Sequence, residues 1–141
     1  MKYIVSLLAL AAACAFAQPE AAPSIVCAGV TTGTTVTVTG QRLSAYINAL
    51  EIRVDPATIT CTVTVATSGP LTSRTVYSGS AIGNTLIRPV VETTTNGVVS
   101  LALAKEFLAG ESLVVTAVTD AGDTNDTSSI VTVIPVIERQ P

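Results

Sequence analysis

Residues 34–39 read Thr-Thr-Val-Thr-Val-Thr, an alternation of apolar and hydroxyl side chains with a period of two. In an extended chain, this period places the valines on one face and the threonines on the other. The same alternation returns over residues 50–54 and 59–65, where charged residues or threonines separate the apolar ones. Because Val, Ile and Thr fit a pleated surface, these stretches predict strands with one buried and one wet face.

The remaining sequence continues this pattern of short apolar stretches between turn residues. Asn96-Gly97, before the apolar residues 98–103, predicts a tight hairpin turn. Residues 72–77 are expected to form an edge strand, and residues 103–110 a helical or irregular turn. No amphipathic helix of useful length is indicated, so the sequence predicts an all-β sandwich of seven or eight strands.

Composition favours one folded domain with an aliphatic core. The 141 residues are 48% hydrophobic and 12% charged, which argues against disorder. Aromatic residues make up only 4% and Trp is missing from the sequence, so Val, Ile, Leu and Ala must fill the interior. The formal charge of −3 argues against binding to nucleic acid or to anionic membranes.

The first residues resemble an export signal. A basic start is followed by an apolar run too short to span a bilayer, and Ala15-Phe16-Ala17 matches a signal-peptidase site. We therefore expect a signal peptide over residues 1–17, a leader or arm strand over 18–30, and the domain over 31–141. This predicts a secreted or cell-surface protein without a membrane span. An alternative is lipidation at Cys14, which follows three alanines.

Cleavage after Ala17 leaves two cysteines, Cys27 and Cys61. In an oxidising compartment, two cysteines in a small β-domain most often pair, so a disulfide is expected between them. The alternative is two buried free thiols. Because the sequence contains no His, a zinc site or a Cys–His nucleophile is not expected.

Three stretches of the chain resemble bacterial immunoglobulin-like domains, the repeat modules of surface adhesins. They are the V-x-V-x-G strand at residues 36–40, the N-G-V-V-S-L-A-L hairpin at 96–103, and residues 108–122. The resemblance covers about residues 31–134 and implies a Greek-key sandwich at a cell surface, with no particular activity. The sequence departs from the family in having a single module, and residues 66–85 are less regular than expected.

One loop carries a dense acidic cluster. Asp120, Asp123, Asn125 and Asp126 offer the hard oxygen ligands that calcium prefers. We therefore name them as a candidate calcium site, the only cofactor that the sequence suggests. The alternative is a solvated hairpin loop, because Asp, Asn and Gly are good turn formers.

The sequence favours a structural role over catalysis. The usual catalytic motifs are missing from it, and its carboxylates are scattered, although a two-carboxylate glycosidase remains an alternative. Residues 24–30 and 130–137 are apolar ends that either pair with a neighbouring subunit or form internal strands. We predict a structural subunit of an extracellular assembly or filament, which self-associates or binds another surface protein. The alternative is an adhesion module for carbohydrate or protein, for which Tyr46, Tyr77 and Phe107 are the candidate platform aromatics.

Overall fold

The computed structural model describes residues 18–69, 73–81, 84–88, 90–95, 98–103, 106–120 and 128–139. These residues form strands and turns and contain no helix, so the predicted all-β class is confirmed. None of the described segments is a helix long and apolar enough to cross a membrane. The expected signal peptide, residues 1–17, lies outside the described residues.

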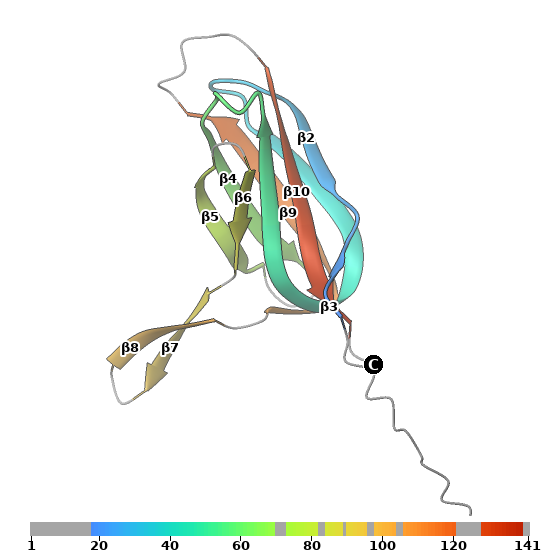
Figure 1. The fold of residues 1–141 in the computed structure, drawn as a ribbon, viewed down its shortest axis with the longest axis vertical. Helices are drawn as coiled ribbons and strands as arrows, with labels where there is room; N and C mark the ends of the chain where they lie inside the picture. Colours follow the sequence, from blue (N-terminus) through green and yellow to red (C-terminus); the bar gives the residue numbers. More distant parts are fainter. Residues whose placement is uncertain are drawn as a thin grey trace, which may run out of the picture.

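Most of the described strands belong to one antiparallel sheet, in the order β1-β10-β3-β9-β4-β5, with β2 paired to β10 and β6 paired to β3 (Figure 1). The strands are β1 (Glu20–Ala21), β2 (Ile25–Val30), β3 (Val36–Asp55), β4 (Cys61–Ser68), β5 (Thr75–Ala81), β6 (Asn84–Ile87), β7 (Val90–Thr95), β8 (Val98–Leu103), β9 (Glu106–Thr119) and β10 (Ser129–Glu138). β7 and β8 pair with each other in a separate hairpin, as Asn96-Gly97 predicts.

The long strand β3 joins the two halves of the sheet. Its first part, up to Ile47, pairs with β9, and its second part, from Tyr46, pairs with β10. Figure 1 shows β3 bending between these parts, so that the sheet folds over on itself. Strands that pass from one layer to another usually do so through bends or bulges, and the β3–β9 register shifts between Thr39 and Arg42.

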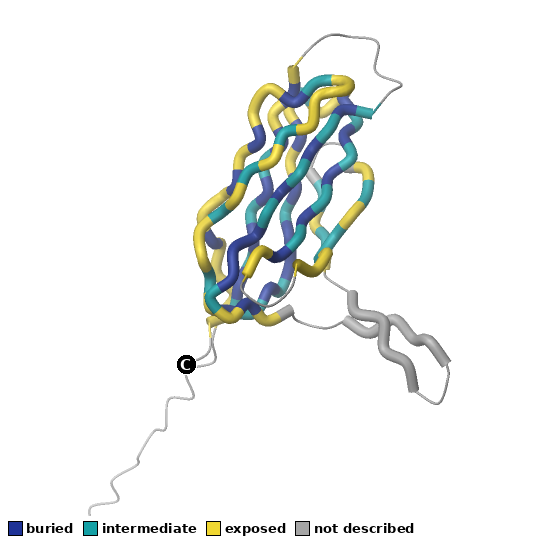
Figure 2. The backbone as a smooth tube through the Cα atoms, turned by 180° about the vertical axis from the view of Figure 1, so that it is seen from behind, coloured by how far each residue is buried: buried dark blue, intermediate teal, exposed yellow. Residues whose placement is uncertain are grey.

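One aliphatic core lies between the two layers. Along β4, Cys61, Val63 and Val65 are fully buried, whereas Thr62 and Thr64 are half-buried on the outer face. Figure 2 shows an alternation of buried and less buried residues along the longer strands of the eight-stranded sheet. The faces predicted from the period of two are therefore confirmed. The core joins both halves of the sheet through Leu50, Ile52, Leu108, Leu113, Val115, Val131 and Val133.

The two ends of the described chain pair with each other. β2 lies antiparallel to β10, with Ile25 opposite Val133 and Val30 opposite Ser129. Ile25 and Val30 are also buried in the core. The second half of the expected leader, residues 18–30, is therefore a strand of this domain, and the alternative in which the terminal segments are internal strands is the one that the structure contains.

The structure differs from the sequence-based expectations at one further segment. The helical or irregular turn expected over residues 103–110 is wrong, because Glu106–Gly110 extends β9 and Leu108 is fully buried. Pairing with the first part of β3 supplies the backbone partners that make this segment extended. The predicted edge strand is present as β5, shifted toward the C-terminus.

Candidate functional site

Three strands meet at the same level near the bend of β3. Arg42 of β3 lies opposite Ser112 of β9, and Ser112 lies opposite Ser68 of β4. Side chains of adjacent strands at one level are close neighbours on a sheet face. This register therefore gathers a guanidinium group and two hydroxyl groups from distant parts of the sequence.

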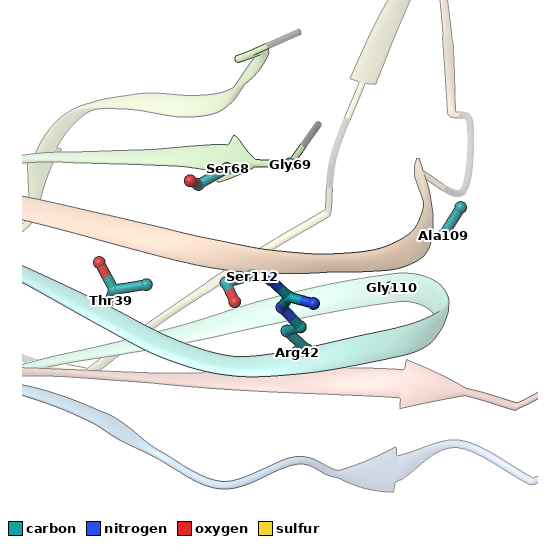
Figure 3. Close-up of a pocket in the computed structure, with 7 residues that line it drawn as sticks. All are labelled: Thr39, Arg42, Ser68, Gly69, Ala109, Gly110 and Ser112. Atoms are coloured by element: carbon teal, nitrogen blue, oxygen red, sulfur yellow. The ribbon is translucent and has the colours of Figure 1, made fainter. Parts of the chain in front are cut away.

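A cleft of about 740 Å³ lies over these strands (Figure 3). It is lined by Thr39, Arg42, Ser68, Gly69, Ala109, Gly110 and Ser112. Figure 3 shows the Arg42 side chain pointing from β3 toward β9, beside Ser112. The lining therefore offers three hydroxyl groups and one permanent positive charge, and the seven lining residues include no carboxylate, thiol or imidazole. Such a set suits binding by hydrogen bonds.

Two glycines give the cleft its shape. Gly110 has a φ of 70°, a left-handed conformation that other residues rarely adopt, next to a register shift between β3 and β9. At Gly69, an added Cβ atom would stand 2.5 Å from Cγ of Glu111. A larger residue at position 69 would therefore displace the Glu111 side chain.

The buried Glu111 forms an ion pair with the half-exposed Arg74 beside the cleft. Its Oε2 atom lies 2.8 Å from Nη2 of Arg74, with 8% of the Glu111 side chain and 46% of the Arg74 side chain exposed. The segment that carries Arg74 is held by two hydrogen bonds with Thr67, one from each backbone amide. The charge of Glu111 is thus balanced by Arg74, whereas Arg42 has no carboxylate partner among the described residues.

We expect an Arg74→Met substitution to lower the free energy of unfolding by about 1–2 kcal/mol, because it leaves the Glu111 carboxylate buried without a cation. The exposure of Arg74 keeps the loss below that of a fully buried pair. Chemical denaturation measures it. The matched control is Arg53→Met, which removes an exposed pair with Glu51 and should cost less than about 0.5 kcal/mol. Equal losses in both variants would contradict the role given to burial.

Two of the three candidate platform aromatics lie together on the same two strands. Tyr46 is opposite Phe107 in the register of β3 and β9, and their ring centroids are 4.8 Å apart. Phe107 is 38% exposed. Tyr77 lies on β5, where its hydroxyl donates a hydrogen bond to the carbonyl of Ser80. The structure therefore brings together two aromatic residues that are 61 positions apart in the sequence.

The predicted disulfide is not formed in the structure, where Cys27 and Cys61 are buried free thiols. The Cys27 Sγ atom lies 3.7 Å from the carbonyl of Val115, whereas Cys61 is opposite Thr119. Cys27 lies on β2 and Cys61 on β4, two strands that do not pair with each other. The disulfide is thus not part of the structure, and its formation in an oxidising compartment stays a prediction.

Most of the predicted calcium site lies outside the described residues. This applies to Asp123, Asn125 and Asp126, so the site as a whole stays a prediction. Asp120 is described, and its Oδ1 atom accepts a hydrogen bond from the hydroxyl of Thr62. Within the described part of the chain, no three His, Cys, Asp or Glu residues are grouped as a metal site would require.

Comparison of the chain with family models, with curated proteins and with solved structures finds no match. The resemblance to bacterial immunoglobulin-like domains thus rests on the sequence motifs alone. Sequence reasoning did not find the cleft, since its residues come from three strands and Arg42 belongs to no local motif. The only available signal was an Arg within a stretch otherwise rich in Thr and Val.

Proposed function

We propose that the protein is a structural subunit of an extracellular or cell-surface assembly, which associates by pairing of strand β5 with a neighbouring subunit. The observation that carries this proposal is the position of β5 at the end of the sheet order, where it pairs only with β4 among the described strands. Its other side presents backbone N–H and C=O groups that a further strand can bind.

The sequence of β5 lacks the features that usually protect an edge. Proteins block exposed edge strands with Lys, other charges, Pro or very short length. β5 has seven residues, Thr-Val-Tyr-Ser-Gly-Ser-Ala, with no charge and no proline. The nearest charged residue before it, Arg74, is bound to Glu111 and does not lie within the strand. This edge is therefore suited to strand addition.

The terminal segments are less suited to exchange between subunits, although β2, like β5, has a single strand partner among the described residues. β1 and β2 both pair with β10. Using either segment as a donor strand would remove buried residues such as Ile25, Cys27 and Val133 from the core. We therefore place the assembly surface at β5. A Greek-key immunoglobulin-like arrangement and export by the signal peptide are parts of the same proposal, supported by the sequence motifs.

A charge placed on β5 tests the proposal. Ser78→Lys should shift the chain from Gln18 onward toward monomer, because paired edges bring like charges together. Sedimentation velocity at increasing protein concentration measures this shift. The matched control is Thr116→Lys on the central strand β9. Each substitution adds one charge to the same outer face and removes one hydroxyl–hydroxyl contact, of 3.1 Å at Ser78 and of 3.2 Å at Thr116.

We expect the unmodified chain and Thr116→Lys to assemble to the same extent. Assembly that survives Ser78→Lys would exclude β5 as the contact. A monomeric unmodified chain at high concentration would overturn self-association altogether. If both lysine variants became monomeric, a general effect of charge on the outer face would replace the specific role of β5.

A further inference from the structure

We propose that the outer face of β3 and β9, from Arg42 to Phe107, binds an acidic oligosaccharide, with a sugar carboxylate held by Arg42 in the cleft. This site is distinct from the β5 edge and does not depend on self-association. It combines the cleft with the Tyr46–Phe107 pair, and strands β3 and β9 contribute residues to both features.

The positive charge of the cleft favours a ligand with a negative charge. Arg42 is exposed and has no carboxylate partner among the described residues, although the whole chain carries a net charge of −3. The nearby carboxylate of Glu111 is balanced by Arg74 at 2.8 Å. Since neither the described residues nor the seven that line the cleft offer a carboxylate to Arg42, its guanidinium group favours an oxyanion, to which it can donate two parallel hydrogen bonds.

The hydroxyl groups of the cleft favour a ligand that carries further hydrogen-bonding groups next to its oxyanion. Thr39, Ser68 and Ser112 each supply a hydroxyl that can donate or accept a hydrogen bond. Ala109 is the only apolar side chain among the seven lining residues apart from the glycines, so polar side chains dominate the side-chain lining. A ligand with hydroxyl groups beside its carboxylate matches this lining, and a uronic acid unit has that chemistry.

The aromatic pair extends the site along the strands. Going down the register, Arg42 lies opposite Ser112, Ser44 opposite Ala109, and Tyr46 opposite Phe107. Arg42, Ser44 and Tyr46 alternate with the more buried Leu43, Ala45 and Ile47, so they share the outer face. Four residues separate Arg42 from Tyr46 by about 13 Å. The ligand must therefore be longer than one sugar unit to reach both groups.

The exposed ring of Phe107 can cover the apolar face of a second sugar unit. Burial of carbon-bound surface against an aromatic ring is favourable without any charge. The tilted contact with Tyr46, at 4.8 Å between centroids, holds the Phe107 ring in place across the strands. The two ends of the site thus contribute differently, since Arg42 selects an acid and Phe107 favours a longer chain.

Calorimetric titration of the chain from Gln18 onward with trigalacturonate tests the proposal. We expect Arg42→Met to weaken binding by about 10-fold to 100-fold, the usual effect of losing a charge-assisted hydrogen bond. The matched control is Arg53→Met, which removes the same charge from the other half of the sheet and should leave binding unchanged. Phe107→Ala should weaken binding of the trimer more than binding of the single sugar acid.

Three ligand controls decide the chemistry. The methyl ester of trigalacturonate keeps the hydroxyl groups and loses the charge, so equal binding of the ester would overturn the role of Arg42. Triglutamate carries the same charge on a peptide, and equal binding of this peptide would overturn the assignment to a saccharide. Equal weakening by Arg42→Met and Arg53→Met, or no binding of trigalacturonate at about 10 mM, would overturn the site itself.

Discussion

An Ile47→Ala substitution is expected to lower the free energy of unfolding by about 2–5 kcal/mol, the usual range for truncating a fully buried aliphatic side chain. Ile47 is completely buried and lies where the pairing of β3 with β9 ends and its pairing with β10 has begun. Its register partners are Glu106 of β9 on one side and Ile137 of β10 on the other. A cavity at this position therefore weakens both layers at once.

Chemical denaturation followed by circular dichroism measures this effect. The milder Ile47→Val substitution should cost about 0.5–1.5 kcal/mol and gives a readout even if the alanine variant does not fold. Gln41→Ala serves as a control, because Gln41 is exposed on the same strand and its loss should change stability by less than about 0.5 kcal/mol. A loss at Ile47 no larger than at Gln41 would contradict the joining role of β3.

The alternation of residue types was sufficient to predict which faces are buried. Val63 and Val65 point into the core and Thr62 and Thr64 do not, as the period of two requires. The physical reason is that successive side chains of a strand point to opposite faces, whatever the strand pairs with. Local sequence therefore carries this information, and the all-β class follows from it.

The continuity of β3 was beyond the reach of the same reasoning. Gly40-Gln41 interrupts the alternation after Thr39 and suggests the end of a strand. In the structure the strand continues through a register shift, because β9 supplies its partners before the bend and β10 supplies them after it. The extended form of residues 106–110 has the same origin. Pairing with strands that are distant in the sequence makes both segments extended, and the local sequence pattern does not indicate this pairing.

For the candidate site too, the sequence indicates some of the residues but not which of them come together. Tyr46 and Phe107 are among the few aromatic residues that could form a binding platform, but their contact depends on the register between β3 and β9. Arg42 was not named, since a single Arg has no pattern around it. The pairing of the cysteines likewise cannot be read from their number, because the number does not say where Cys27 and Cys61 lie in the core.

The thiols of Cys27 and Cys61 are expected to react with a thiol reagent at least about 10³-fold more slowly in the folded protein than in denaturant. Both are fully buried, so the reagent reaches them only after the sheet opens. Burial also raises the pKa of the Cys27 thiol, which lowers the fraction of reactive thiolate at pH 8. The buried Cys61 Sγ atom lies 3.5 Å from the hydroxyl oxygen of Ser129, so it too is enclosed by the core.

Counting reactive thiols in denaturant separates the free thiols from the disulfide that the sequence suggested. The chain from Gln18 onward, purified without reductant and unfolded, should give both thiols, and a Cys27→Ala variant should give one. No reactive thiol in the unfolded chain would mean that Cys27 and Cys61 are joined by a disulfide, which the structure does not contain. Rapid labelling of the folded chain would place the cysteines at the surface and would contradict a core that includes β2.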